Sequence, residues 1–135
     1  MAKSSPTASP TRIQTRIGYV MSAMPVLFML MSAVMKLSHT PMVVEGFAKS
    51  GMSVSVLTAI GVVELLCVIL YVVPATAVLG AVLSTGYLGG AIMVHVRASE
   101  LAFIAPLVLG MLAWGGLFMR DLRIRNLLPV SRHRL

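Results

Sequence analysis

Residues 59–73 read AIGVVELLCVILYVV, an apolar run that contains one acid, Glu64. The fold depends on which solvent surrounds this run. The whole chain shares this character. Of its 135 residues, 58% are hydrophobic and 11% are charged, against about 45–50% and about 25% in soluble domains. A soluble protein of this length cannot hide that much apolar surface from water. The composition therefore predicts an integral membrane protein with a single domain.

Four segments are each close to the ~20 apolar residues that a helix needs to cross ~30 Å of hydrocarbon. They are residues 17–36, 54–73, 76–96 and 101–119. Only helices and closed barrels satisfy their backbone inside lipid, and continuous apolar runs without alternation favour helices. The connections after the second and third segments are tight turns, which force antiparallel neighbours. The expected fold class is all-α, an antiparallel bundle of four transmembrane helices over residues 17–120.

The first connection is longer and has helix signals of its own. Thr40 and Pro41 suit an N-cap and a first helical residue, and Gly51 suits a C-terminal stop. Residues 41–50 are therefore predicted as a short helix that lies in the membrane interface, with a plain loop as the alternative.

The two ends of the chain are expected to be tails. Residues 1–16 are rich in Ser, Thr and Pro and contain no acid, which is typical of a disordered segment. The same composition fits a transit peptide or the first part of a signal peptide, but three further apolar segments follow the first one. Residues 121–135 form a second, basic tail.

The distribution of positive charge predicts the orientation in the membrane. With four spans, both tails and the middle turn share one side, which carries eight of the eleven Lys and Arg residues. The positive-inside rule therefore predicts that both termini lie in the cytoplasm. Anionic lipid head groups are the expected partner of the basic tails. No aromatic residues are interleaved with the basic ones, so nucleic acid is not expected.

Small residues on segment 76–96 predict how the helices pack. They repeat at four-residue spacing in one stripe and in a second pair: Ala77, Ala81, Thr85 and Gly89, then Gly86 and Gly90. Lipid tails are as apolar as leucine, so close approach at small residues holds membrane helices together. This segment is therefore expected at the centre of the bundle.

Polar residues within the spans give the candidate site. Glu64 lies near the midplane, where an acid costs on the order of 2.5–3.5 kcal/mol to insert, and such residues face the bundle interior. The predicted polar pocket opens outward and is lined by Lys36, Glu64, Tyr87, His95 and Arg97. Two alternatives remain open. Lys36, His95 and Arg97 can extend to head groups, and Glu64 can be a neutral acid with a structural role.

Other chemistry is poorly supported by the sequence. The single Cys67 excludes an intrachain disulfide and a CxxC redox pair. The three histidines, His39, His95 and His133, do not have the spacing of a metal or haem site. No nucleophile has an adjacent base, and no Gly-rich phosphate loop is present. We therefore expect no catalytic residue, no metal site and no evident cofactor.

Several short segments in the same order resemble the DoxX-like family. They are residues 32–37 (SAVMKL), 44–47 (VEGF), 61–65 (GVVEL), 80–91 (GAVLSTGYLGGA), 95–97 (HVR) and 114–121 (WGGLFMRD). The resemblance implies a small bacterial four-helix inner-membrane protein with Lys36, Glu64, His95 and Arg97 on the family's polar positions. Members commonly show Pro-Arg-Thr after the second span, where this chain has Pro74-Ala75-Thr76 and so lacks one charge. Founding members of the family are linked, as small membrane subunits, to a quinone-reducing sulfur oxidoreductase.

Two functions are consistent with these features. The first is an accessory or ligand-binding membrane subunit, with a quinone as ligand and a membrane redox protein as partner by family analogy. The second is a small proton-coupled transporter in which Glu64 alternates between proton and substrate. Small multidrug exporters are four-helix chains with one membrane carboxylate, but their acid lies in the first helix and they lack a strong charge bias.

Overall fold

The computed structural model describes residues 9–127, and every regular element in that range is helical. The elements are α1 (Arg12–Leu37), α2 (Pro41–Lys49), the 3-10 turn η1 (Val54–Val56), α3 (Leu57–Val72), α4 (Ala77–Arg97), the 3-10 turn η2 (Leu101–Phe103), α5 (Ile104–Arg120) and α6 (Leu122–Leu127). Four helices, α1, η1 with α3, α4, and η2 with α5, are long and apolar enough to cross a membrane. This confirms the expected all-α fold of four membrane-spanning helices.

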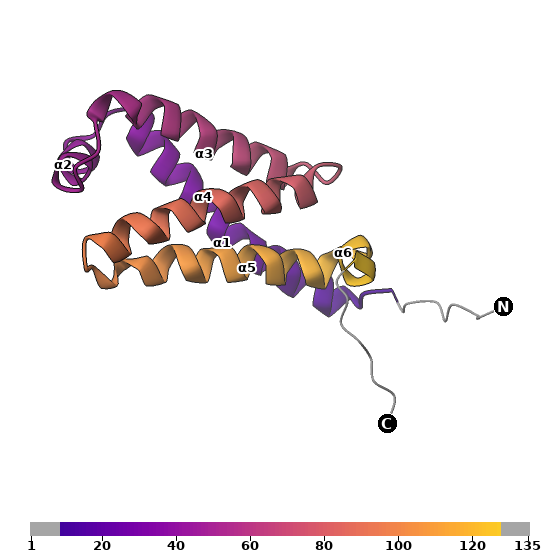
Figure 1. The fold of residues 1–135 in the computed structure, drawn as a ribbon. Helices are drawn as coiled ribbons and strands as arrows, with labels where there is room; N and C mark the ends of the chain where they lie inside the picture. Colours follow the sequence, from indigo (N-terminus) through magenta and orange to yellow (C-terminus); the bar gives the residue numbers. More distant parts are fainter. Residues whose placement is uncertain (1–8, 128–135) are drawn as a thin grey trace.

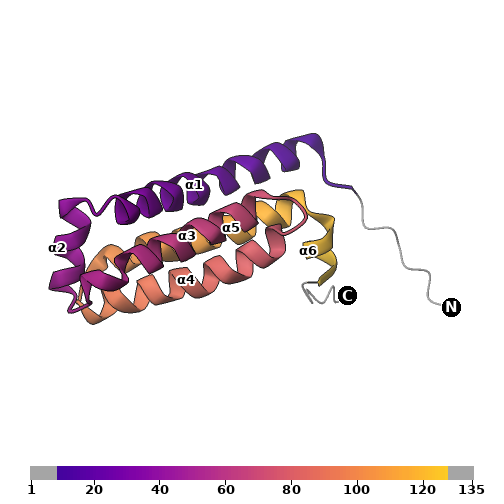
Figure 2. The ribbon, with the colours of Figure 1, turned by 90° about the horizontal axis from the view of Figure 1, so that it is seen from above.

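The four long helices form a closed ring of neighbours. Helix α1 packs on α5 and α3, α3 packs on α4, and α4 packs on α5. Helix α1 runs obliquely across the other three in Figure 1, and Figure 2 shows it along one side of them. The start of α1 and helix α6 lie at one end of the bundle, and α2 lies at the other (Figures 1 and 2).

The expectation that α4 forms the centre of the bundle was wrong, because the four helices form a ring and α4 packs on α3 and α5 as one member of it. The most extensive packing is that of α1. The reason is a close crossing of α1 and α5 at two glycines. A Cβ atom added to Gly18 would lie 2.8 Å from the carbonyl oxygen of Gly116. Backbones that approach this closely bury long stretches of both helices.

The small residues of α4 divide into two groups. Ala77 and Ala81 are buried against neighbouring helices. Thr85 is exposed, although its hydroxyl accepts a hydrogen bond from Trp114 Nε1 at 2.7 Å. Gly86, Gly89 and Gly90 are exposed, and an added Cβ would meet no atom within 4 Å.

The inward face of α4 instead continues through Gly80, Ser84 and Leu88, all of which are buried. A Cβ added to Gly80 would collide with the backbone of Tyr71 on α3. The α3–α4 contact is therefore set at Gly80, which fixes the rotation of α4 and turns its later glycines outward.

Helix α1 begins at Arg12, before the expected start at residue 17, because a capping box stabilises its first turn. The Thr11 hydroxyl accepts a hydrogen bond from the backbone N–H of Gln14 at 3.2 Å, and Gln14 Oε1 accepts one from the Thr11 N–H at 3.1 Å. Part of the expected N-terminal tail is therefore helical, while residues 1–8 lie outside the described range.

The remaining ends follow local signals. Helix α2 occupies the position of the predicted short helix, with Thr40 as N-cap, Pro41 first and Gly51 just beyond its end at φ +75°. Helix α6 lies within the expected C-terminal tail, after Asp121 accepts a hydrogen bond from the Arg123 N–H at 2.9 Å. Residues 128–135 of that tail lie outside the described range.

Candidate functional site

Glu64, the acid of α3, lies inside the bundle and is 2% exposed. Its Oε2 accepts a hydrogen bond from Lys36 Nζ at 2.8 Å and one from the Ser32 hydroxyl at 3.2 Å. Lys36 Nζ also donates to the Ser32 hydroxyl. These three residues, Ser32 and Lys36 from α1 and Glu64 from α3, are called the polar cluster below.

The sequence brings these side chains together in two ways. Ser32 and Lys36 are four residues apart and therefore share one face of α1. On α3, Gly61 lies one turn before Glu64, and a Cβ added there would lie 3.1 Å from Lys36 Cβ and 3.1 Å from Leu37 Cγ. Because glycine leaves this space free, α3 approaches α1 closely enough for the Lys36 side chain to turn inward to Glu64.

The cluster compensates the buried carboxylate with a cation and a hydroxyl. Removing two charges from water is costly, and the pair is tolerated only when geometry and further hydrogen bonds are good. Here the ion pair is short, and Ser32 adds a second donor. The Lys36 side chain remains 13% exposed, so the cationic side of the pair is the side that other molecules can reach.

Tyr87 of α4 lies beside the polar cluster. Lys36 Nζ is 6.0 Å from the centroid of its ring, which is within the range of a cation–π interaction. Lys36, Glu64 and Tyr87 of the predicted pocket thus come together from three helices. Ser32 was missed, although its spacing of four from Lys36 is a signal that sequence reasoning can use.

His95 and Arg97 lie apart from the cluster, at the end of α4. His95 Nδ1 is 2.9 Å from Glu100 Oε2, a contact with the adjoining turn. Arg97 is exposed, and no ion pair joins it to another residue in the range 9–127. His95 and Arg97 therefore lie at the end of α4 and do not join Glu64 in the predicted pocket.

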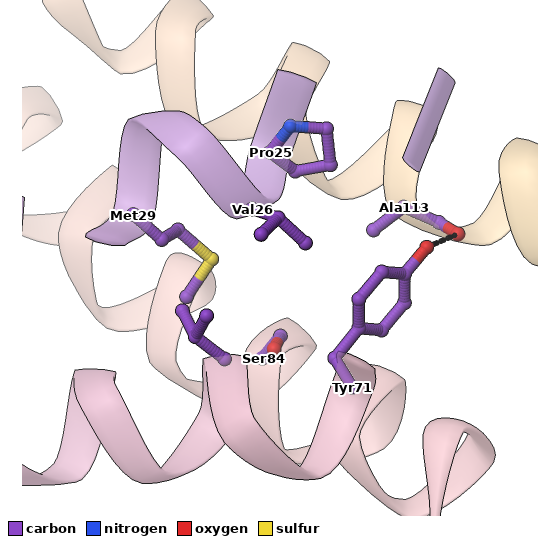
Figure 3. Close-up of a pocket in the computed structure, with 7 residues that line it drawn as sticks. Pro25, Val26, Met29, Tyr71, Ser84 and Ala113 are labelled. Carbon is purple, nitrogen blue, oxygen red and sulfur yellow. Dashed lines mark hydrogen bonds between the residues drawn. The ribbon is translucent and has the colours of Figure 1, made fainter. Parts of the chain in front are cut away.

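A small cavity of about 10 Å³ lies between α1, α3, α4 and α5, away from Lys36. It has room for about one water molecule. Figure 3 shows Pro25, Ser84 and Tyr71 around it, with the Tyr71 hydroxyl donating to the Ala113 carbonyl oxygen at 2.6 Å. Within the described residues, no three His, Cys, Asp or Glu side chains are close enough together to hold a metal ion.

The sequence profile of the DoxX-like family matches residues 20–116, most of the chain. The chain belongs to the DoxX-like family. Comparisons with curated proteins and with solved structures give no match. The family and the four spans together make this a multi-pass membrane protein.

The DoxX-like match begins within α1 and ends within α5, so it contains the whole polar cluster and Tyr87. It also contains His95 and Arg97. Arg120 and helix α6 lie beyond it. The region that matches the family and the basic end of this DoxX-like protein are therefore separate parts of the chain.

Proposed function

We propose that this DoxX-like protein is an accessory membrane subunit that binds a small lipophilic ligand at the polar cluster, with a quinone as the class of ligand. The observation that carries the proposal is the buried ion pair between Lys36 and Glu64 at 2.8 Å. Ionisable groups inside a membrane are costly and mark functional positions by default. Membership of the DoxX-like family supports the link to quinone complexes by analogy only.

The chemistry of Lys36 suits a carbonyl ligand. A lysine ammonium group has three N–H donors, and within residues 9–127 two of them are used, toward Ser32 and Glu64. The third is available to a quinone carbonyl oxygen, and the ring of Tyr87 lies nearby to contact the head group. The apolar tail of such a ligand would extend along the exposed aliphatic side chains that cover the lipid-facing surface.

The proposal is tested by purification from native membranes in mild detergent, followed by mass spectrometry of the lipids and quinones that remain bound. We expect the wild type to retain quinone and Glu64→Gln to retain several-fold less, because the amide no longer holds the ammonium in place. Glu45→Gln is the matched control, since Glu45 is an exposed carboxylate on α2. Equal retention by wild type and Glu64→Gln would contradict the proposal.

The alternative is a proton-coupled transporter that uses the same carboxylate. The short contact with Lys36 favours the subunit, because a transporter needs Glu64 to leave its cation and exchange a proton with substrate. Flux of cationic drugs into proteoliposomes under a pH gradient separates the two. We expect none above empty liposomes, whereas flux that Glu64→Gln abolishes would establish the transporter.

We also propose that the protein lies in a bacterial inner membrane with both termini in the cytoplasm and a redox protein as partner. The charge bias supports this, since Arg12, Arg16, Arg120, Arg123 and Arg125 all lie toward the end of the bundle that carries α6. Alkaline phosphatase fused after residue 51 should be active, and the same enzyme fused after residue 127 should be inactive. Mass spectrometry of co-purified proteins tests the partner.

A further inference from the structure

The bundle end that carries α6 contains an arginine held between two aromatic rings. The guanidinium carbon of Arg120, the last residue of α5, lies 5.1 Å from the ring centroid of Tyr19 and 5.5 Å from that of Tyr71. Tyr71 is 3% exposed, and its hydroxyl is fixed by hydrogen bonds with Ala113 and Ser22. Tyr19 is 58% exposed. The guanidinium of Arg120 therefore lies between the buried, hydrogen-bonded ring of Tyr71 and the exposed ring of Tyr19.

The close crossing of α1 and α5 holds Arg120 in this position. A Cβ added to Gly18 would lie 3.1 Å from Arg120 Cβ and 2.8 Å from the Gly116 carbonyl oxygen. The two glycines thus bring the backbone of α1 against the last turn of α5. The base of the Arg120 side chain is fixed by this contact and does not depend on a flexible loop.

Within the described range of residues 9–127, no carboxylate forms an ion pair with Arg120. The chain has four acids, and three are engaged elsewhere: Glu64 with Lys36, Glu100 with His95, and Asp121 with Arg123. The fourth, Glu45, lies on α2 at the opposite end of the bundle.

The side chain of Arg120 has an unused donor. Among residues 9–127, its buried Nε has no hydrogen-bond partner. Nearby Arg125 differs, because it donates to the carbonyl oxygens of Phe118 and Met119. A partly buried cation with an unused donor calls for an anion from outside the chain, because an uncompensated charge is costly to remove from water.

We propose that Arg120 binds a phosphate oxyanion, supplied by the head group of an anionic phospholipid. The planar guanidinium matches phosphate through paired N–H donors. Arg120 ends a membrane helix and lies beside tyrosine, the arrangement typical of head-group depth. Exposed Arg12 and Arg16 add positive charge at the same end, which attracts anionic lipid. The ligand and residues differ from those of the polar cluster, so this proposal is independent of the proposed function.

The test is native mass spectrometry of the full chain in detergent, titrated with phosphatidylglycerol. We expect Arg120→Gln to weaken binding at least five-fold, and Arg120→Lys to weaken it as well because the paired donors are lost. Tyr19→Leu removes only an exposed ring and should weaken binding two- to three-fold in a fully folded protein. Arg97→Gln, an exposed arginine at the end of α4, is the matched control and should bind as the wild type does. Unchanged binding by Arg120→Gln and Tyr19→Leu would overturn the proposal.

A second titration with inorganic phosphate separates the two sources of the oxyanion. If only phosphatidylglycerol binding depends on Arg120, the ligand is the lipid, as we expect. If inorganic phosphate binds with the same dependence and displaces the lipid, the phosphate site stands but the lipid as its source is overturned. If neither ligand depends on Arg120, the site itself is overturned.

Discussion

Replacing Lys36 with methionine is expected to destabilise the protein strongly, because it leaves Glu64 buried without its cation. At 2.8 Å between Nζ and Oε2, the attraction of two unit charges is about 6 kcal/mol at an effective dielectric constant of about 20. Part of this offsets the cost of removing both groups from water. Removal of one partner from a buried pair therefore costs about 3–5 kcal/mol, and we expect Lys36→Met to lie in that range.

The assay is the free energy of unfolding in detergent, measured by titration with a denaturing surfactant. Glu64→Leu should cost less than Lys36→Met, because Lys36 is partly exposed and its ammonium can move toward the head groups. The double variant Lys36→Met/Glu64→Leu should be more stable than the sum of the two single losses predicts. Lys49→Met is the control: this exposed lysine on α2 should change stability by less than about 1 kcal/mol. Additive losses, or a Lys36→Met variant as stable as this control, would refute the reasoning.

Two further substitutions test the packing, with the same unfolding measurement. Gly80→Ala should lower the free energy of unfolding by about 1–3 kcal/mol or more, because the new methyl group collides with the backbone of Tyr71. Its control is Gly89→Ala, whose methyl group meets no atom within 4 Å and should change stability by less than about 1 kcal/mol. Equal effects of the two would contradict the assigned rotation of α4. Tyr71→Phe should cost about 1–3 kcal/mol, because it removes hydrogen bonds to Ala113 and Ser22 and leaves the buried Ser22 hydroxyl without that partner. A Tyr71→Phe variant as stable as the wild type would show that these bonds contribute nothing.

The fold class could be predicted because hydrocarbon limits the choices so severely. Four apolar runs of membrane length leave only a helical bundle or a barrel, and the runs lack strand alternation. The start of α1 was placed too late because the apolar run begins near Ile17. The true start is set by polar residues outside that run, Thr11 and Gln14, which cap the helix. Their spacing of three is a capping signal visible in the sequence.

The candidate site was predictable in part. The inward orientation of Glu64 follows from the cost of exposing an acid to lipid. Lys36 could be included in the predicted pocket because it is the cation at the end of the first span. His95 was expected beside them, but the turn after α4 presents Glu100 to it at 2.9 Å. The prediction considered only residues within the spans and so left out Glu100, a carboxylate in the connecting turn.

The packing face of α4 could not be read from its small residues alone. Several such stripes run along this helix, and each of them permits close approach of a neighbour. The choice among them is made by a residue on another helix, Tyr71, whose backbone fits only against Gly80. Contacts of this kind depend on the register of two helices and are not encoded within either one.

The ion pair between α1 and α3 also bears on how the chain enters the membrane during synthesis. Helix α1 leaves the ribosome first, with Lys36 in its last turn. Glu64 follows on α3 and can pair with Lys36, which has already been synthesised. This pairing lowers the free-energy cost that an isolated acid has during translocon-mediated insertion. The first two spans are therefore expected to integrate as one hairpin rather than singly.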